Sequence, residues 1–555
     1  MQRRHVLVAA LCAIVGICVF GTTGAGAKTA ANCDTQANDT PGTLLPCITK
    51  SDLQGYMTDL WNIAVANPGP DGHPSRNSGE PGYWESAQYV KNKMESWGYT
   101  VSLQQYDFPY TAFLSLPTFS VISPAMSLTF NQDWTAAPSN GNVTGAIQPA
   151  GGIILPPTPT PTSSSGCTSA DFAGFTPGKI ALIQRGSCNF GVKVLNAQAA
   201  GAIGVIIFNE GNPGRTGLQG INLIDANGTT FAASIPVISV TFAVGQALYN
   251  AYQGGTPPVV SMSVSALADT RADWNVIADS KGGDKNHTLV IDAHLDAIYG
   301  AGMLDNGSGS MSILDIAYLM RNAQTTNHLR FIWFGGEELG LLGSDFYVHN
   351  LSSTDASHIG YDLDADVTAT PNYTLGILDP SAGDLFDPNT TTAGTFPNRV
   401  YKASLVGRDA GIAYLNSQHQ NHELFSPEGT DAYEFNLIGV PASGVLTGQD
   451  CCKTQAQVDL FAPNYIGTVN QVGNFEGNLL PPDNFDGGCV DNSFRWCDNL
   501  DNNNFDVMTL MTRDFANMVL TMAYDTKVMS ASGSAVINKK TALSQETGSR
   551  HIAGS

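Results

Sequence analysis

A chain of 555 residues is too long for one ordinary hydrophobic core, and this length favours two or three domains. Hydrophobic residues make up 43% of it, and its 58 glycines and 29 prolines are typical of a globular, loop-rich protein and not of a disordered or fibrous one. The formal net charge of −22 disfavours binding to nucleic acid or to an anionic membrane surface.

The first 27 residues are typical of an export signal. Arg3 and Arg4 precede an apolar stretch over residues 5–20, and Ala25-Gly26-Ala27 has the small-residue pattern of a cleavage site. The apolar stretch is short for a membrane-spanning helix, and no later segment is long and apolar enough to span a bilayer. We therefore expect a secreted or periplasmic protein with no membrane partner after signal cleavage. Its net charge would be −24, because 24 basic and 48 acidic residues remain.

The cysteines that remain after this cleavage are typical of disulfides in an oxidising compartment, because their number is even. They are Cys33, Cys47, Cys167, Cys188, Cys451, Cys452, Cys489 and Cys497. Their spacing does not match that of a zinc ribbon, so the sequence predicts no cysteine-based metal site.

Residues 28–115 are predicted to form the first part of the larger domain. A helix is expected over residues 50–67, and apolar residues recur at helical spacing from Tyr83 to Trp97. Gly98 ends this second helix, and a strand follows it. We interpret the pattern as a helix that covers a sheet, followed by an edge strand of that sheet.

Residues 116–265 are predicted to form a second, β-rich domain. The stretch "LPPTPTPTSSSG" at residues 155–166 has the composition of an extended loop. Residues 179–211, "KIALIQRGSCNFGVKVLNAQAAGAIGVIIFNEG", alternate strand, helix and strand in a compact β–α–β module.

Residues 266–530 return to the larger domain. Long apolar strands alternate with helices here, which predicts an α/β fold with a mostly parallel sheet and helices on both faces. Ligands of such sheets bind beyond the carboxyl ends of the strands. Residues 531–555 are small and polar and are expected to form a flexible tail.

Polar side chains gather where three successive predicted strands end. In "AHLDAIYGAGMLDNGSGS", His294 and Asp296 are two residues apart and therefore leave the same face of the strand, and Asp305 follows a glycine-rich turn. One of the first pair could bind a metal while the other fixes the imidazole tautomer. Taken alone, this pattern equally fits a structural histidine.

The second strand ends in "GGEELGLLGSDFYV", where Glu337 and Glu338 are expected to open a helix. Adjacent side chains point in different directions, so one could bind a cation while the other accepts a proton from water. The alternative is a helix N-terminus that simply favours acidic residues.

The third strand places Asp362, Asp364 and Asp366 on one face. A buried row of three carboxylates requires a cation or protons, so at least Asp366 is expected to bind a metal. The alternative is an exposed strand, whose carboxylates would need no cation. Together the three strand ends offer nitrogen and oxygen ligands without thiolate, which favours zinc, either one ion or two ions about 3.5–4 Å apart.

These runs closely resemble the secreted co-catalytic zinc aminopeptidases, in the superfamily that also holds carboxypeptidase-type and transferrin-receptor-type members. The matching stretches are "NVIADSKGG", "AHLDAIYGAGMLDNGSGS", "GGEELGLLGSDFYV", "DADVTATPNY" and "GVPASGVLTG", within residues 270–450. Residues 166–209 resemble a protease-associated domain inserted into such enzymes, in which Cys167 and Cys188 match the usual disulfide.

The resemblance implies a ligand set. His294 and Asp366 would hold one zinc, Asp305 would bridge, and Glu338 would hold the second zinc. Alignment on Pro371 to Tyr373 selects Asp366 over Asp364 for this role.

The resemblance also implies the catalytic residues and the substrate. Glu337 would be the general base that activates the bridging water, and Asp296 would be the partner of His294. The substrate would be a peptide or protein.

The sequence departs from the family pattern near its C-terminal end. The family has a tyrosine and a histidine before a "CD" pair, whereas Ser493 and Phe494 stand there before Cys497-Asp498. The family's Arg-Ser-Asp run is also altered, to "EGTDAYEF". The lost tyrosine would have helped to stabilise the oxyanion, so we expect a slower or differently organised enzyme.

Three interpretations follow from this departure. A different residue could complete the second metal site, with Asp491, Asp498, His419 and His422 as the candidates. The enzyme could instead work with one zinc, since His294, Asp305 and Asp366 already form a three-ligand open site. Or the chain could be a degenerate peptidase that serves as a binding module. The presence of Glu337 argues against this interpretation, because only catalysis needs that residue. The sequence thus predicts an exported zinc-dependent aminopeptidase of unknown oligomeric state, with the binding module as the alternative.

Overall fold

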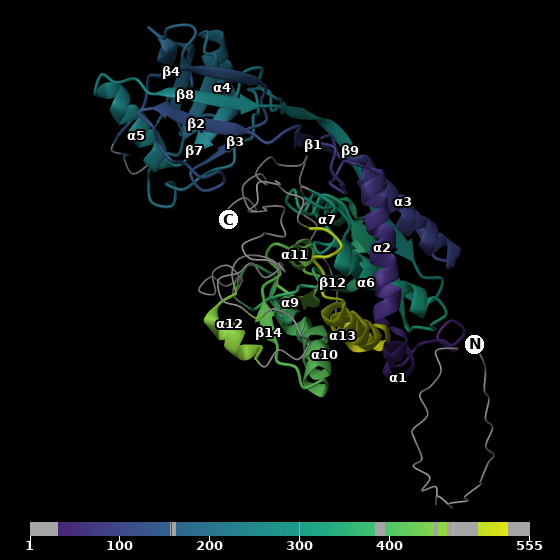
Figure 1. Ribbon diagram of the computed structural model, residues 1–555. Coiled ribbons are helices and arrows are strands. Elements are labelled where there is room, and N and C mark those ends of the chain that lie inside the picture. The colour runs from purple at the N-terminus through teal and green to yellow at the C-terminus, as the bar shows by residue number, and fades with distance from the viewer. Residues whose placement is uncertain are drawn as a thin grey trace, which may run out of the picture.

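The computed structural model describes residues 32–155, 157, 163–298, 300–382, 394–448, 453–462, 470 and 498–530. The predicted export signal (1–27) and C-terminal tail (531–555) lie outside these residues. Two β-sheets organise the described chain into a larger and a smaller unit, joined by two long strands (Figure 1).

The larger unit is built on an eight-stranded sheet in the order β1-β9-β11-β10-β12-β15-β13-β14. Its centre, β11-β10-β12-β15, is parallel, while β9 and β13 run antiparallel to the neighbours at either side of that centre. The strands are β1 (Thr100–Phe113), β9 (Ala266–Asp279), β10 (Asp284–His294), β11 (Asn327–Phe334), β12 (Ile359–Ala365), β13 (Gly376–Leu378), β14 (Glu423–Phe425) and β15 (Ala442–Leu446). The predicted α/β fold with a mostly parallel sheet is confirmed.

Helices cover both faces of this sheet, because alternate residues of the central strands are buried on opposite sides. Leu289 and Ile291 of β10 face a core shared with α2 (Lys50–Ala66), α3 (Pro81–Ser96), α6 (Gly307–Met320) and α13 (Phe505–Tyr524). Val290 between them faces a second core with α7 (Leu342–Asn350) and α11 (Ala432–Leu437). The remaining helical elements are α1 (Pro41–Leu44), η2 (Leu45–Cys47), α8 (Ser353–His358), α9 (Asn398–Ala403), α10 (Leu405–Ser417), α12 (Gln455–Leu460) and α14 (Thr526–Ser530).

The N-terminal segment belongs to the larger unit, although most of that unit follows the smaller one in sequence. A disulfide joins Cys33 and Cys47 just before α2. The predicted order of a helix and then an edge strand is confirmed by α3 and β1, and Gly98 between them has a φ of +94°. Strands β1 and β9 pair along their whole length, from Thr100–Asp279 to Phe113–Ala266, and carry the chain to and from the smaller unit (Figure 1).

The smaller unit contains a seven-stranded sheet in the order β2-β8-β4-β5-β6-β7-β3. Alternate residues of β5 and β6 pack toward α5 on one face and toward α4 on the other. A disulfide joins Cys167 and Cys188, as the resemblance predicted. The elements are β2 (Thr118–Ser123), β3 (Trp134–Ala136), β4 (Gly141–Pro149), η3 (Ser169–Phe172), β5 (Ile180–Gln184), α4 (Phe190–Ala199), β6 (Gly204–Phe208), β7 (Val237–Val240), α5 (Phe242–Gln253) and β8 (Val259–Val264).

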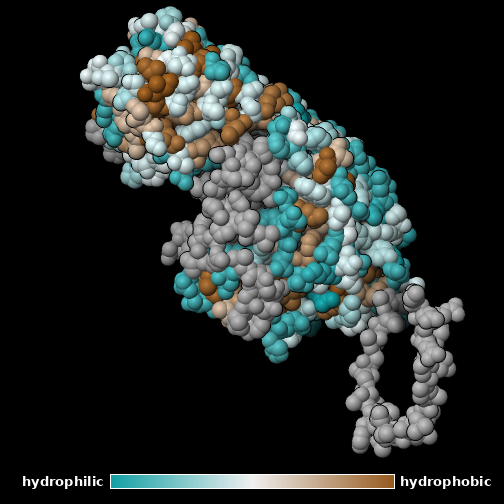
Figure 2. All heavy atoms as spheres, viewed as in Figure 1, coloured by the Kyte–Doolittle hydropathy of each residue, from teal (hydrophilic) through white to brown (hydrophobic). Residues whose placement is uncertain are grey.

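The surface differs between the two units on the face that Figure 2 shows. Hydrophobic side chains are more frequent there on the smaller unit and near its junction with the larger one. Among the exposed large hydrophobic residues, Leu114 and Leu116 follow β1, Leu267 lies on β9 and Ile122 lies on β2. Within the described residues, no helix is long and apolar enough to cross a membrane.

Candidate metal centre

Three of the predicted ligands meet at the carboxyl ends of neighbouring parallel strands. His294 is the last residue of β10, Asp366 directly follows β12, and Asp305 lies in the loop before α6. His294 Nε2 is 2.9 Å from Asp305 Oδ1 and 3.3 Å from Asp366 Oδ1. One ligand atom from each residue lies within 4.8 Å of the others, which is the spacing expected around a single ion.

The environment of these three residues favours a cation. All three are buried, and within the described residues Oδ1 of Asp366 has no hydrogen-bond partner. Burial by itself lowers the pKa of His294, but the surrounding carboxylates, Glu337 and Asp366 above all, raise it well above its usual value. Converging buried carboxylates are costly unless a cation neutralises them. One imidazole and two carboxylates with room for a further ligand suit zinc.

Glu337 lies beside this cluster, with its Oε2 3.8 Å from His294 Nε2. Burial raises its pKa well above the usual value, and the negative charge of Asp366 adds to the effect. A carboxylate of raised basicity at this position is suited to accept a proton from water.

The predicted place of Glu337 and Glu338 at the start of a helix is wrong. The helix α7 begins only at Leu342, and the two residues lie in a turn after β11. Gly336, Gly340 and Leu341 have φ values of +64°, +101° and +59° and redirect the chain before the helix can start. The turn buries Glu337 and leaves Glu338 half-buried.

Glu338 is not part of the three-ligand cluster that the structure brings together. Its role as the ligand of a second ion therefore stays a prediction.

Asp296 connects the histidine to the loop of the predicted base. Its Oδ1 lies 3.4 Å from His294 Nδ1 and accepts a hydrogen bond from the Glu337 amide at 3.2 Å. Its Oδ2 accepts a hydrogen bond from the Ser78 hydroxyl. Asp296 is fully buried, so these contacts fix its orientation.

The third-strand aspartates are all buried, but only Asp366 reaches the cluster. The Asp364 carboxylate accepts hydrogen bonds from the Thr430 hydroxyl and the Ala432 amide, both in the altered "EGTDAYEF" stretch. Burial and the charge of Asp366 raise the pKa of Asp364 to about 7. Asp362 meets the buried Asp292 of β10, and burial raises the pKa of both well above the usual value, which favours their protonated forms.

Asp498 does not point a carboxylate oxygen at the cluster. Its Oδ1 accepts the Leu304 amide at 2.7 Å and its Oδ2 accepts the Asp305 amide at 2.9 Å, so it holds the loop that carries Asp305. Burial raises its pKa to about 7, although the two amides and Arg76 act to lower it.

The other candidates for completing the second metal site differ in position. His419 is exposed and His422 is half-buried, in the loop before β14. β14 is the edge strand, three positions from β12 in the sheet, so neither histidine joins the cluster. Asp491, Ser493 and Phe494 lie outside the described residues, as do Cys451, Cys452, Cys489 and Cys497.

The sequence alone did not indicate two residues that support the centre. Arg76 and Ser78 precede α3 and contact the loop after β10, which connects His294 to Asp305, from more than 200 residues away in the chain. The only signal was a polar run, "SRNSGE", in front of a predicted helix.

A second group of potential ligand atoms is formed by Asp345, His349 and Glu434. His349 Nδ1 lies 2.7 Å from Asp345 Oδ1 and 2.9 Å from the Asp345 carbonyl oxygen, four residues earlier on α7. Side-chain contacts within one helical turn bring the Asp345 and His349 atoms together without a metal.

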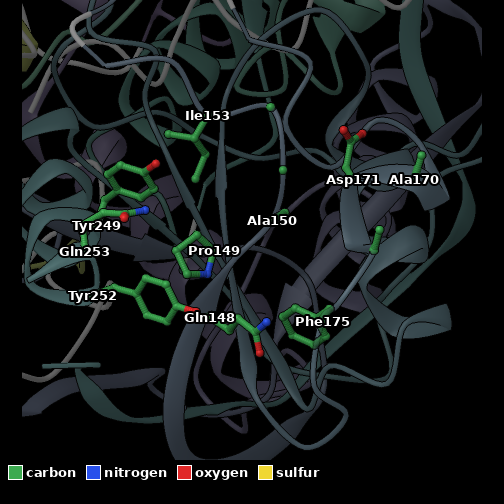
Figure 3. A pocket seen from close by; sticks show the side chains of 13 residues that line it. Gln148, Pro149, Ala150, Ile153, Ala170, Asp171, Phe175, Tyr249, Tyr252 and Gln253 are labelled. Atoms are coloured by element: carbon green, nitrogen blue, oxygen red, sulfur yellow. The ribbon is translucent and has the colours of Figure 1, made fainter. Parts of the chain in front are cut away.

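The described part of the chain contains cavities outside the cluster. One of about 100 Å³ lies between Ala297, Gly300 and Leu339 on one side and β1 on the other. A larger one of about 330 Å³ lies in the smaller unit, where Tyr249 and Tyr252 of α5 face the end of β4 (Figure 3). It contains none of the predicted site residues.

The fold and this cluster are those expected of a zinc metallopeptidase with an inserted β-rich domain. Residues 275–470 match the model of peptidase family M28, and residues 151–248 match the PA domain. An aminopeptidase of Pseudomonas aeruginosa is 34% identical over 441 residues, which cover 78% of this chain and 76% of that protein. Leucine aminopeptidase 2 of Trichophyton tonsurans is 30% identical over 453 residues, covering 78% and 84%. The chain belongs to peptidase family M28, as an aminopeptidase-type member with an inserted PA domain.

The overall fold agrees with a solved relative. The aminopeptidase from Aneurinibacillus sp. strain AM-1 superposes with a TM-score of 0.53 at 21% identity, over 90% of this chain and 98% of that one. The predicted family, fold class, metallopeptidase activity and zinc requirement are thereby confirmed.

Proposed function

We propose that this protein is an exported aminopeptidase that removes the N-terminal residue of peptides, with His294, Asp305 and Asp366 as the ligands of a catalytic zinc. The convergence of these three side chains beside the buried Glu337 carries the proposal. Glu338 is the proposed ligand of a second ion that shares Asp305. Its support is the family resemblance and its position directly after Glu337.

The residues divide the chemistry among them. A bound zinc supplies Lewis acidity, which polarises the scissile carbonyl and acidifies an attacking water. Glu337 takes the proton of that water and later delivers it to the leaving amine. Asp296 Oδ1 lies 3.4 Å from His294 Nδ1 and would favour the tautomer with the proton on Nδ1, which leaves Nε2, the nitrogen that faces Asp305 and Asp366, to bind the metal.

The relatives and the disulfides support the substrate class and the location. The Trichophyton relatives are named leucine aminopeptidases, so we propose an apolar N-terminal residue as the preferred one. Two disulfides, Cys33–Cys47 and Cys167–Cys188, support folding in an oxidising compartment outside the cytoplasm.

The wild-type protein and the variant Glu337→Gln test the proposal. The purified wild-type protein should contain zinc and hydrolyse leucine p-nitroanilide but not its N-acetylated form, and chelation should abolish the activity until zinc is returned. Glu337→Gln keeps the shape of the side chain and removes the base, so kcat should fall about 10²–10⁴-fold with unchanged zinc content. Glu85→Gln on the exposed face of α3 is the matched control and should leave kcat unchanged.

Other outcomes would contradict the proposal. If the zinc-loaded wild-type protein hydrolyses no aminoacyl anilide, and Glu337→Gln binds peptide as tightly as the wild type, the chain is a binding module. If Glu338→Gln leaves two tightly bound zinc ions in place, Glu338 is not the ligand of the second ion.

A further inference from the structure

The segment Ser75–Glu80, between α2 and α3, lies beneath both loops of the metal centre. Arg76 is fully buried, and its guanidinium donates hydrogen bonds to the carbonyl oxygens of Leu295, Ala301 and Gly302 in the loop between His294 and Asp305. The Arg76 amide donates to the Gly300 carbonyl at 2.8 Å. The segment is therefore anchored to the first metal loop by main-chain and side-chain contacts.

Asn77 and Glu80 complete the anchoring. Asn77 Oδ1 accepts the Gly300 amide at 2.9 Å. The buried Glu80 carboxylate accepts hydrogen bonds from Ser75 and Tyr110, both at 2.6 Å. The residue between Asn77 and Glu80 that faces the catalytic side is Ser78, and this framework fixes its position.

Ser78 joins the two loops through one oxygen atom. Its Oγ donates to Asp296 Oδ2 at 3.0 Å and accepts the Gly336 amide at 2.9 Å. Asp296 Oδ1 in turn accepts the amide of Glu337, the residue after Gly336. These contacts form a closed ring of Ser78, Asp296, Glu337 and Gly336, and Ser78 is only 3% exposed.

We propose that Ser78 is a positioning residue for catalysis, which sets the orientation of Asp296 toward His294 and the position of the Glu337 main chain. This inference rests on the proposed function, because it assigns Ser78 to the same reaction. Without the hydroxyl, Asp296 Oδ2 loses the hydrogen bond that Ser78 donates, and the Gly336 amide loses its acceptor. Rotation of Asp296 or movement of the Gly336–Glu337 peptide then misplaces the histidine and the base relative to each other.

The test compares Ser78→Ala with Ser86→Ala. Ser86 is also fully buried, and its hydroxyl donates to the Gly82 carbonyl at 2.7 Å inside α3, so both variants lose one buried hydrogen-bonded hydroxyl. Ser78→Ala should lower kcat at least tenfold with KM within about twofold, and should raise the zinc Kd, measured by chelator competition, by about tenfold. Ser86→Ala should keep the wild-type kcat, KM and zinc Kd.

A double-mutant cycle shows whether Ser78 acts through Asp296. In an Asp296→Asn background, Ser78→Ala should cost less than threefold in kcat, because the residue that it orients has already been changed. Equal effects of Ser78→Ala in both backgrounds would overturn the proposal, as would kcat and zinc Kd values equal to those of Ser86→Ala. If the wild type is inactive, the proposed function fails, and the zinc Kd of the two serine variants still decides whether Ser78 positions the site.

Discussion

Replacing Asp279 by asparagine should destabilise the protein in a pH-dependent way. Asp279 ends β9, and its Oδ1 accepts hydrogen bonds from His328 Nε2 at 2.9 Å and Arg330 Nε at 2.8 Å. Its Oδ2 accepts a third from Arg330 Nη2 at 3.2 Å. His328 and Arg330 belong to β11, the strand that leads to Glu337, so the carboxylate joins β11 to β9, the strand that returns from the PA domain.

The magnitude follows from the pKa of Asp279. Burial alone would raise it, but the hydrogen bonds from His328 and Arg330 outweigh burial and lower the pKa from 3.8 to about 2. A pKa that is lower in the folded state means stabilisation that is complete above the unfolded pKa and is lost as the pH falls toward the folded pKa. The difference is worth about 2 kcal/mol at pH 7, of which about half is lost at pH 3.

Urea unfolding at pH 7, 5 and 3 measures this effect. The free-energy difference between the wild type and Asp279→Asn should be nearly constant from pH 7 to 5 and should shrink by about half at pH 3. Asp269→Asn is the matched control on the same strand, since Asp269 is exposed and ion pairs of exposed carboxylates, such as its pair with Arg271, contribute about 0–1 kcal/mol. A difference for Asp279→Asn that stays constant down to pH 3 would refute this electrostatic reasoning.

Three further predictions concern the loops around the centre. Arg76→Met leaves three carbonyl oxygens without their donor and should lower the free energy of unfolding by about 3 kcal/mol, measured by urea titration, whereas Arg76→Lys should recover part of this loss. Asp498→Asn replaces one acceptor of the Leu304 and Asp305 amides by a donor, so the zinc Kd should rise about 10–100-fold in a chelator competition, while an unchanged Kd would contradict the holding role. Gly309→Ala places a methyl group against the Ala365 carbonyl, next to Asp366, and should lower the melting temperature and the zinc content, whereas Gly55→Ala on the open face of α2 should be neutral or slightly stabilising.

Much of the fold was predictable because hydrophobic spacing is a local property. The alternation of strands and helices after Trp274 and the helix that ends just before Gly98 both follow from patterns within 20 residues. The three-ligand cluster was predictable as well, because parallel strands bring their carboxyl ends to one edge of the sheet. His294 and Asp366 lie at the ends of adjacent strands and are brought together by this rule alone.

The residues that hold the cluster in place were not predictable in the same way. Arg76 and Ser78 reach their partners across more than 200 residues of sequence, and neither belongs to a periodic pattern. The start of α7 was misplaced because the acidic pair resembles a helix N-terminus, whereas the left-handed backbone of Gly340 and Leu341 delays the helix. Asp498 was considered as a ligand from its place in the family pattern, but only the fold shows its two oxygens directed at main-chain amides.

The electrostatics of the centre couple metal binding to proton release. Burial raises the pKa of Asp305 and Glu337, and the surrounding carboxylates raise the pKa of His294 in spite of its burial. Each of these raised values favours a bound proton when no cation neutralises the cluster, and a metal ion competes for the same charge. Zinc binding at pH 7 should therefore release protons, and the zinc affinity should increase as the pH rises from 6 to 8. Calorimetric titration of zinc into the metal-free protein, prepared with a chelator, in buffers of different ionisation enthalpy measures the number of protons released. If a variant with His294→Ala and Asp366→Asn releases as many protons as the wild type, the protons come from groups outside the cluster. In that case the charge of the cluster does not determine its affinity for zinc.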